Sequence, residues 1–253
     1  MTIRFTAEFA IRPFLQHHFD LSYAHLQRWA LDDNPHVRRL ASEGCRPRLP
    51  WGQRVPVLMR QPDIILPILE RLKDDDSDYV RRSVANNLND ISKDYPDIVI
   101  TLAQRWLADQ PSAQRRWIIK HATRGLVKAG HAEALALLGF AQTIELAALD
   151  FRLSASELRL HDDLQLDLAF DLPQAQELVI DFALHLPRAN GKHSVKVFKW
   201  KTGTFAAGKH TLSQRYRFRP LTTRRYYPGR HTFELKINGQ PLAQQHVHLR
   251  LAV

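Results

Sequence analysis

The sequence has a single cysteine and no long apolar run. With Cys45 alone, the 253-residue chain can form no intramolecular disulfide and offers no CxxC pair to a structural zinc ion. No stretch approaches the roughly 20 apolar residues that cross a bilayer, and the first residues lack the apolar segment of a signal peptide. We therefore expect a cytoplasmic protein without a membrane partner.

Several catalytic motifs are also missing. The chain contains no GxxxxGK[ST] loop, GxGxxG turn or GxSxG elbow, which disfavours nucleotide hydrolysis, dinucleotide redox chemistry and serine esterase activity. The 13 histidines are scattered, and the nearest approach to ligand spacing, His17 and His18 with His25, lacks an acid at helical spacing. We expect no metal ion and no cofactor. Cys45 has no histidine nearby in sequence, so we expect a small core residue.

Acidic residues are absent from a long stretch of the second half. Between Phe182 and Phe233 there are twelve Lys and Arg and no Asp or Glu, with aromatic residues interleaved in "KVFKWK" and "RYRFRP". The whole chain carries a formal charge of +10. Clustered cations bind polyanions by releasing condensed counterions, although a solvated basic surface would have the same composition.

The hydrophobic pattern changes near residue 145. Before it, proline-punctuated segments have helical periodicity; after it, segments such as "LQLDLAFDL" and "ELVIDFALHL" alternate with period two. We predict a multidomain, all-α plus all-β chain, with a helical solenoid over 1–145 and an immunoglobulin-like β-sandwich over 146–253. Seven antiparallel strands are expected, at 151–160, 164–172, 177–186, 193–201, 210–219, 231–238 and 246–252.

The helical part contains a repeat. "NPHVRRLASEG", "DSDYVRRSVANN" and "PSAQRRWIIKHA" share a turn-forming entry, a paired arginine and a helix, at spacings of 43 and 34 residues. These spacings are typical of HEAT and armadillo solenoids, whose units bury their apolar sides against their neighbours. The repeat gives Arg39, Arg82 and Arg116 equivalent positions. They either bridge adjacent repeats as ladder residues or grip a phosphate backbone.

Polar residues one and two turns further on share this helical face. They are Glu43, Asn86 and Lys120, then Asp90 and Arg124. Two carboxylates there fit poorly with helix stability, since Glu43 closes a helix before Gly44 and Asp90 lies inside one. Each could simply pair with Arg39 or Lys93. The following loop, "RPRLPW", presents Trp51, which either stacks on a sugar or base or fills the core.

The chain resembles the alkylpurine DNA glycosylases of the AlkC branch. The resemblance covers nearly the whole length, through "FTAEFAIRPFL", "NPHVRRLASEGCRPRLPW", "YVRRSVANNLNDISKDYP", "RRWIIKHATRGL", "ANGK", "KVFK" and "FRPLTTRRYYPG". It implies a HEAT-like solenoid followed by an immunoglobulin-like domain that contacts DNA. Members of this branch have additional N-terminal helices before the segment that matches "FTAEFA", so we expect either a truncated chain or a shortened relative.

The resemblance also implies a function, which is DNA base excision repair. Such enzymes are monofunctional glycosylases that hydrolyse the N-glycosidic bond of cationic N3-alkylated bases, chiefly 3-methyladenine and 3-methylcytosine, without base flipping. By motif match Asp90 looks like the principal catalytic carboxylate, with Glu8 and Glu43 beside the lesion and Trp51 against the damaged nucleotide. A fixed carboxylate can stabilise an oxocarbenium-like sugar and orient water.

A larger set is expected to hold DNA phosphates. It consists of Arg39, Arg46, Arg48, Arg82, Asn86, Arg116, Lys120, Arg124, Lys199, Lys201, Arg224 and Arg225. We expect a monomer that binds duplex DNA with alkylated bases. Two alternatives are a noncatalytic binder of distorted or damaged DNA and, in third place, a protein scaffold of the kind that HEAT arrays commonly form.

Overall fold

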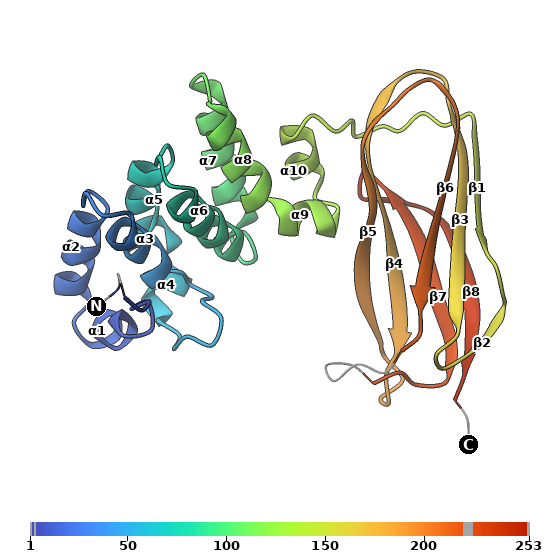
Figure 1. Ribbon diagram of the computed structural model, residues 1–253, viewed down its shortest axis with the longest axis horizontal. Helices are drawn as coiled ribbons and strands as arrows, with labels where there is room; N and C mark the ends of the chain where they lie inside the picture. The colour runs from blue at the N-terminus through green and yellow to red at the C-terminus, as the bar shows by residue number, and fades with distance from the viewer. Residues whose placement is uncertain (1, 3, 220–224, 252–253) are drawn as a thin grey trace. The chain divides into compact units, whose positions relative to one another are not determined.

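The computed structural model describes residues 2, 4–219 and 225–251 and consists of two compact units, Met1–Leu126 and Val127–Val253. The first unit is helical, and the second contains a β-sandwich (Figure 1). Helices followed by a sandwich are what the periodicities predict. The last helix ends at Leu137 and the first strand begins at Ala148, while the predicted domain division at 145/146 stays a prediction.

Ten α-helices and one 3-10 helix occur within the described residues. They are α1 (Ile11–His17), α2 (Phe19–Trp29), α3 (Pro35–Gly44), α4 (Pro56–Arg60), η1 (Pro62–Ile64), α5 (Leu66–Leu72), α6 (Asp78–Ile91), α7 (Pro96–Ala108), α8 (Ala113–Ala122), α9 (Arg124–Ala129) and α10 (Ala132–Leu137). No helix among the described residues is long and apolar enough to span a membrane.

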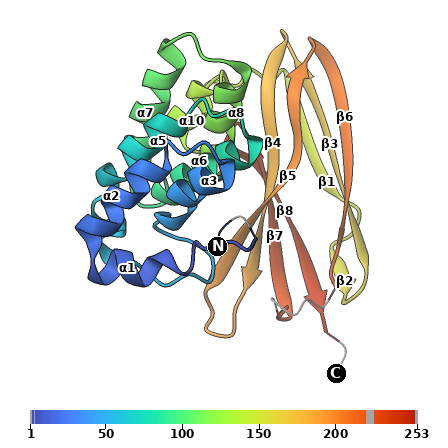
Figure 2. The same cartoon turned by 60° about the vertical axis from the view of Figure 1, so that its left-hand side comes forward.

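The three repeat segments are the helices α3, α6 and α8, and α6 packs against both of the others (Figures 1 and 2). Local capping explains two of their starts. The side chain of Asn34 accepts from the backbone N–H of His36, and that of Ser112 accepts from the N–H of Arg115. The apolar stripe of α6, which includes Val80, Val84 and Leu88, is buried as its periodicity predicts.

The first arginine of each pair is the ladder residue of the solenoid. Arg38 bonds Asp75 and the carbonyls of Asp32 and Asp33. Arg81 donates to the carbonyls of Asp75 and Asp76, and Arg115 pairs with Asp74 and Asp109. The neighbouring Arg39, Arg82 and Arg116 make none of these contacts. The ladder reading was therefore right for the pair but wrong for the member chosen.

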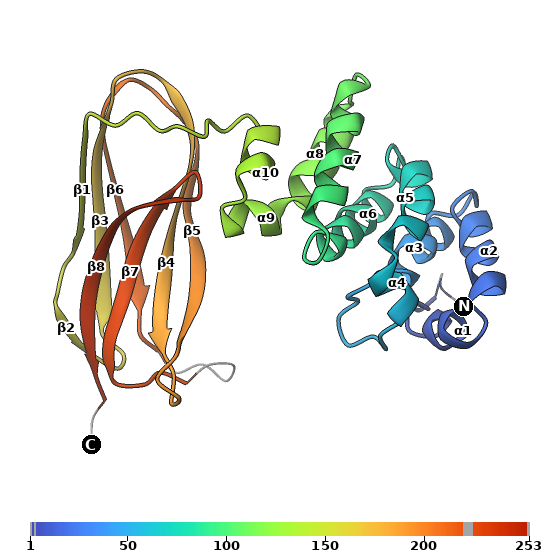
Figure 3. The same cartoon turned by 180° about the vertical axis from the view of Figure 1, so that it is seen from behind.

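Eight strands form two sheets within the described residues. They are β1 (Ala148–Leu153), β2 (Glu157–Arg159), β3 (Asp163–Leu172), β4 (Gln176–Pro187), β5 (His193–Phe205), β6 (Gly208–Arg217), β7 (Gly229–Ile237) and β8 (Gln240–Arg250). One sheet has the order β1-β3-β6 and the other β2-β8-β7-β4-β5, which Figure 3 shows from behind. The inward residues of β3, Leu164 to Leu172 at every second position, are buried as predicted.

The predicted strand 151–160 is two strands. Ser154 ends the pairing of β1 with β3, and the carbonyl of Ser156 accepts from the backbone N–H of His248 as β2 joins β8 in the other sheet. Because β2 and β8 run parallel, the expectation of antiparallel strands throughout was wrong here. The chain changes sheets over three residues, which a periodicity count cannot detect.

Strand β4 is buried on both faces. Its inner side packs in the sandwich core, while Val179 on the other side packs with Val127, Leu135 and Phe140. Helix α10 and the end of α9 therefore belong to the same compact unit as the sandwich. The β7–β8 turn holds this helical segment against β4, because Asn238 bonds both Val179 and the carbonyl of Ala141.

Candidate functional site

Two buried carboxylates come from the ends of neighbouring helices. Glu43 lies in the last turn of α3 and Asp90 in the last turn of α6, with exposed fractions of 6% and 2%. An acid at a helix C-terminus opposes the helix dipole, and a buried charge is costly unless partners compensate it. The partners of these two groups therefore define the site.

One guanidinium joins the two carboxylates. Arg46, in the loop after α3, donates from Nε to Asp90 Oδ2 at 2.8 Å and from Nη1 to Glu43 Oε1 at 2.7 Å. Burial alone lowers the pKa of Arg46, but its hydrogen bond to Asp90 and the charges of both carboxylates raise the pKa above its ordinary value. Arg46 was predicted to bind phosphate, yet it is only 8% exposed and bonds carboxylates instead.

The other oxygens of the two carboxylates differ in how they are held. Glu43 Oε2 accepts from the buried hydroxyl of Ser83 at 2.6 Å. Asp90 Oδ1 accepts from Lys93 Nζ at 3.2 Å, and this lysine side chain is 49% exposed. Buried groups therefore hold both oxygens of Glu43. Among the described residues, Asp90 Oδ1 is bonded only by an exposed lysine.

A second arginine extends the network to the third predicted carboxylate. Arg39 Nη1 donates to Glu8 Oε2 at 3.2 Å and to Thr6 Oγ1 at 2.9 Å, and its Nη2 lies 3.5 Å from Glu43 Oε1. The guanidinium also lies 4.7 Å from the centroid of the Tyr79 ring. The structure therefore brings Glu8, Glu43 and Asp90 together in one chain of ion pairs.

Trp51 stands in the loop that carries Arg46. Its side chain is 98% exposed, and its backbone has φ +57°, a conformation that costs energy for a bulky residue. Within the described residues the indole makes no ring stack or cation contact. The core-filling alternative was therefore wrong, and Trp51 is free to contact a ligand.

The remaining predicted cations of the helical unit lie at its surface. Arg82, Arg116 and Lys120 are exposed, and the Arg82 side chain pairs with Asp78 at 2.9 Å. Arg48 is held by Asp94, while Arg124 Nη2 donates to Asn86 Oδ1 at 2.9 Å.

Two pKa shifts report on this surface. Burial lowers the pKa of Arg124, and the charge of Asp90 opposes that effect. Burial also lowers the pKa of His121, and the charges of Arg124 and Arg82 lower it further. The charge of Asp90 therefore favours a charged Arg124, whereas the two arginines favour a neutral His121.

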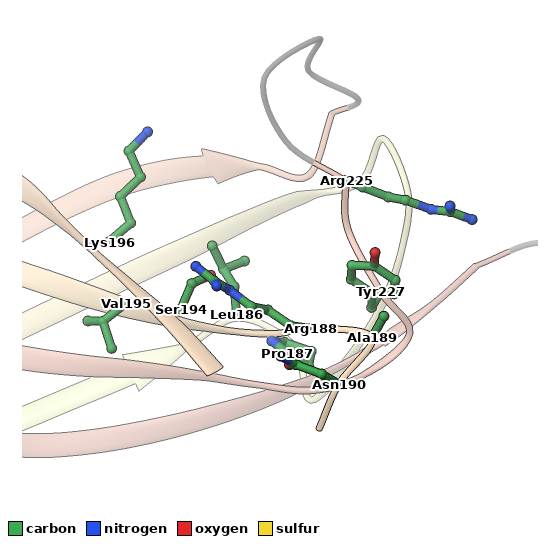
Figure 4. A pocket seen from close by; sticks show the side chains of 10 residues that line it. All are labelled: Leu186, Pro187, Arg188, Ala189, Asn190, Ser194, Val195, Lys196, Arg225 and Tyr227. Atoms are coloured by element: carbon green, nitrogen blue, oxygen red, sulfur yellow. The ribbon is translucent and has the colours of Figure 1, made fainter. Parts of the chain in front are cut away.

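The sandwich has a cationic pocket of about 590 Å³ at its β4–β5 hairpin (Figure 4). Arg188, Lys196 and Arg225 line it together with Tyr227, and Arg225 lies 5.5 Å from the Tyr227 ring centroid. No acidic residue of the described chain lines the pocket. Of the predicted sandwich cations, Arg225 belongs to this pocket, Lys199 and Lys201 are exposed on β5, and Arg224 lies outside the described residues.

Each of the two units matches a known protein family. Residues 2–126 match the family model described as DNA alkylation repair enzyme, and residues 147–251 match the C-terminal Ig-like domain of the uncharacterised protein YhaZ. The chain is 40% identical to the alkylpurine DNA glycosylase AlkC of Pseudomonas fluorescens, solved bound to DNA containing an abasic site analog, with a TM-score of 0.91 over 97% of this chain and 68% of that one. The chain belongs to the DNA alkylation repair enzyme family.

A second relative of this DNA alkylation repair chain is known by sequence. The uncharacterized protein YhaZ of Bacillus subtilis strain 168 is 41% identical over 236 residues, which are 93% of this chain and 66% of YhaZ. The chain therefore spans about two thirds of both relatives. The HEAT-like and Ig-like architecture expected from the sequence agrees with both matches.

Sequence reasoning missed one buried arginine of this family member. Arg12 on α1 is 0% exposed and donates to the carbonyls of Gly44 and Arg46 at 3.0 and 2.9 Å, and to that of Gln53. A signal was present, because Arg12 lies three residues before the buried Leu15 and so shares its helical face.

Cys45 is not available as a nucleophile. Cys45 is buried, and burial raises the pKa of its thiol to about 12, so it is a thiol rather than a nucleophilic thiolate at neutral pH. Among the described residues, no three His, Cys, Asp or Glu side chains are grouped so that they could hold a metal ion.

Proposed function

We propose that this chain hydrolyses the N-glycosidic bond of cationic N3-alkylated bases in duplex DNA, such as 3-methyladenine and 3-methylcytosine, and leaves an abasic site. The observation that carries the proposal is the buried Glu43–Arg46–Asp90 network in a chain 40% identical to AlkC. A base that already carries positive charge needs no strong general acid to leave. The site needs a fixed carboxylate instead.

Asp90 is the proposed catalytic group. When Lys93 turns away into solvent, Asp90 Oδ1 becomes available to the deoxyribose, while Arg46 keeps Oδ2 in place. As the bond from C1′ to the base nitrogen breaks, its electron pair goes to the base, which leaves neutral, and the sugar becomes oxocarbenium-like. Water then forms the new bond to C1′ and gives its proton to Asp90 Oδ1 or to solvent.

The neighbouring groups support this step. Glu43 and Glu8 add negative charge near the developing cation, and Trp51 packs against the damaged nucleotide from its exposed loop. The resemblance to the AlkC branch favours access from the backbone side of a bent duplex without base flipping. We further propose a monofunctional enzyme that acts as a monomer in the cytoplasm.

Cations on both units, together with the neutral amide of Asn86, are proposed to bind DNA phosphates. The free and surface-paired groups suit this role because they can exchange a surface partner for a phosphate at little cost. They are Arg48, Arg82, Asn86, Arg116, Lys120 and Arg124 on the helical unit, and Lys199, Lys201 and Arg225 on the sandwich. Arg39 and Arg46, which pair with buried carboxylates, are proposed to stay there.

A noncatalytic binder of distorted DNA is the second candidate. The observation that favours it is the set of exposed cations on both units, which would bind DNA without any chemistry. A binder would use the same cations but would need neither Asp90 nor its partners.

Release of free 3-methyladenine from methylated duplex DNA tests the choice. We expect Asp90→Asn to lower the single-turnover release rate by roughly 100- to 1,000-fold, because it removes the charge that stabilises the sugar cation. DNA affinity, measured in parallel, should stay within about 3-fold because Asp90 is 2% exposed and binds no phosphate. Asp97→Asn, the same change at an exposed position of α7, is the matched control.

The outcomes separate the two candidates. Release by the parent and by Asp97→Asn, with loss in Asp90→Asn, supports the glycosylase. Tight DNA binding by all three chains without any base release would support the noncatalytic binder instead.

A further inference from the structure

Arg12 is a fully buried cation without a carboxylate partner. Its side chain is 0% exposed, and none of the described acidic groups lies within ion-pair distance of it. Its Nη2 has no hydrogen-bond partner in the described structure, and burial lowers the pKa of the guanidinium. An uncompensated buried charge costs stability, and such arrangements cluster at functional sites.

The contacts of Arg12 all go to one loop. Nη1 donates to the carbonyl of Gly44 at 3.0 Å and to that of Arg46 at 2.9 Å, and Nε donates to the carbonyl of Gln53. These carbonyls lie at the two ends of the loop that joins α3 to α4. Helix α1 thus fixes, through one side chain, a segment more than 30 residues away in sequence.

Two predicted functional groups depend on the position of that loop. Arg46, whose own carbonyl Arg12 holds, supplies the guanidinium that bonds both Glu43 and Asp90. Trp51 lies between the two anchored ends, on a backbone with φ +57° that the rest of the loop must hold in place. Misplacement of a catalytic group by about 1 Å can cost on the order of 100-fold in rate.

We propose that Arg12 is a positioning residue of the site: it holds the loop of residues 44–53 so that Arg46 and Trp51 stand where the chemistry needs them. It acts through the loop and does not touch the substrate. This role rests on the proposed glycosylase function for its effect on rate, whereas its effect on the loop can be measured without any activity.

Three variants test the proposal. Arg12→Met keeps the bulk and removes every donor; Arg12→Lys keeps the charge but not the planar fork. Arg115→Met is the matched control, because Arg115 is also buried and also donates to two backbone carbonyls, those of Trp106 and Asp109, away from the loop. Hydrogen exchange of the loop amides, single-turnover release of 3-methyladenine and DNA affinity are measured for each.

In Arg12→Met we expect the loop amides to exchange at least about 10-fold faster, since the loop loses its anchor. The release rate should fall roughly 10- to 100-fold, while DNA affinity should change by less than about 3-fold, because Arg48 is the one member of the proposed phosphate-binding set that lies in this loop. For Arg12→Lys, both the loop exchange rate and the release rate should lie between those of the parent and those of Arg12→Met. Arg115→Met should lower stability without changing loop exchange or the release rate.

Three results would overturn the proposal. They are unchanged loop exchange in Arg12→Met, faster exchange with an unchanged release rate, and complete recovery by Arg12→Lys, which would mean that charge alone matters. If Arg12→Met does not fold, Arg12→Lys must show both effects in weaker form. If the parent releases no base, the glycosylase proposal fails, and loop exchange alone decides whether Arg12 holds the loop.

Discussion

At the scale of single residues, the arginine pairs 81/82 and 115/116 of the repeat each have one ladder member and one exposed member. Arg81 bonds the carbonyls of the preceding loop, while Arg82 is exposed and, among the described residues, pairs with the surface residue Asp78. Adjacent helical residues point about 100° apart, so a one-residue error in the repeat register exchanges the two roles. The sequence identifies the pair, but only packing against the neighbouring repeat decides which arginine is buried.

Trp51 gives a residue-scale prediction. We expect Trp51→Ala to leave the free energy of unfolding within about 0.5 kcal/mol of the parent, because a 98% exposed indole buries almost no area. The rate of 3-methyladenine release should fall, since the change removes the proposed contact with the damaged nucleotide. Urea unfolding and single-turnover release measure the two effects.

Leu21→Ala, which truncates another exposed apolar side chain outside the site, serves as the control for Trp51→Ala. A stability loss above about 2 kcal/mol in Trp51→Ala would show a structural role. An unchanged release rate would remove Trp51 from the site.

At the scale of elements, the sequence predicts those helices and strands that have a regular hydrophobic period. The repeat helices and the long strand β3 follow patterns with period 3.6 or two over ten residues or more. Strand β2 has three residues and is set by its pairing with β8, about 90 residues away in sequence, which leaves no local pattern. The same limit applies to the site: Glu43 and Asp90 stand out as poor helix choices, but the partners of Arg46 and Arg12 depend on contacts across more than 30 residues of sequence.

The turn between β7 and β8 carries the element-scale prediction. Gly239 has φ +77°, and a Cβ atom there would lie 2.4 Å from the Cα of Gly130, which follows α9. We expect Gly239→Ala to destabilise the second unit by about 3 kcal/mol, through strain and overpacking together. Hydrogen exchange of the β7 and β8 amides resolves this unit from the first.

Gly203→Ala is the matched control, because a Cβ at this position of β5 meets no atom within 4 Å. It should change the stability of the second unit by less than about 0.5 kcal/mol. If Gly239→Ala were equally mild, the docking of α10 on the sandwich would not depend on this close approach.

At the scale of the whole molecule, the chemistry is assigned to the helical unit alone, whereas DNA affinity is assigned to groups on both units. The carboxylate network lies within Met1–Leu126, whereas the stretch of twelve cations without an acid lies within Val127–Val253. Phosphate contacts contribute affinity through counterion release and leave the bound-state rate unchanged unless they position the reacting groups. The two contributions should therefore be separable by mutation.

The cationic pocket of the sandwich tests this separation. We expect the double change Lys196→Glu and Arg225→Glu to weaken duplex DNA binding by 10-fold or more, as roughly estimated from two lost phosphate contacts, and to lower the salt slope by about one unit for each contact. The release rate at saturating DNA should not change, because neither residue belongs to the unit that holds Asp90. Arg152→Glu, on strand β1 and outside the pocket, controls for net charge. If the loss of DNA affinity per reversed charge is the same in the double variant and in Arg152→Glu, the sandwich attracts DNA only through its overall field. A larger loss in the double variant means that phosphates are bound at the pocket.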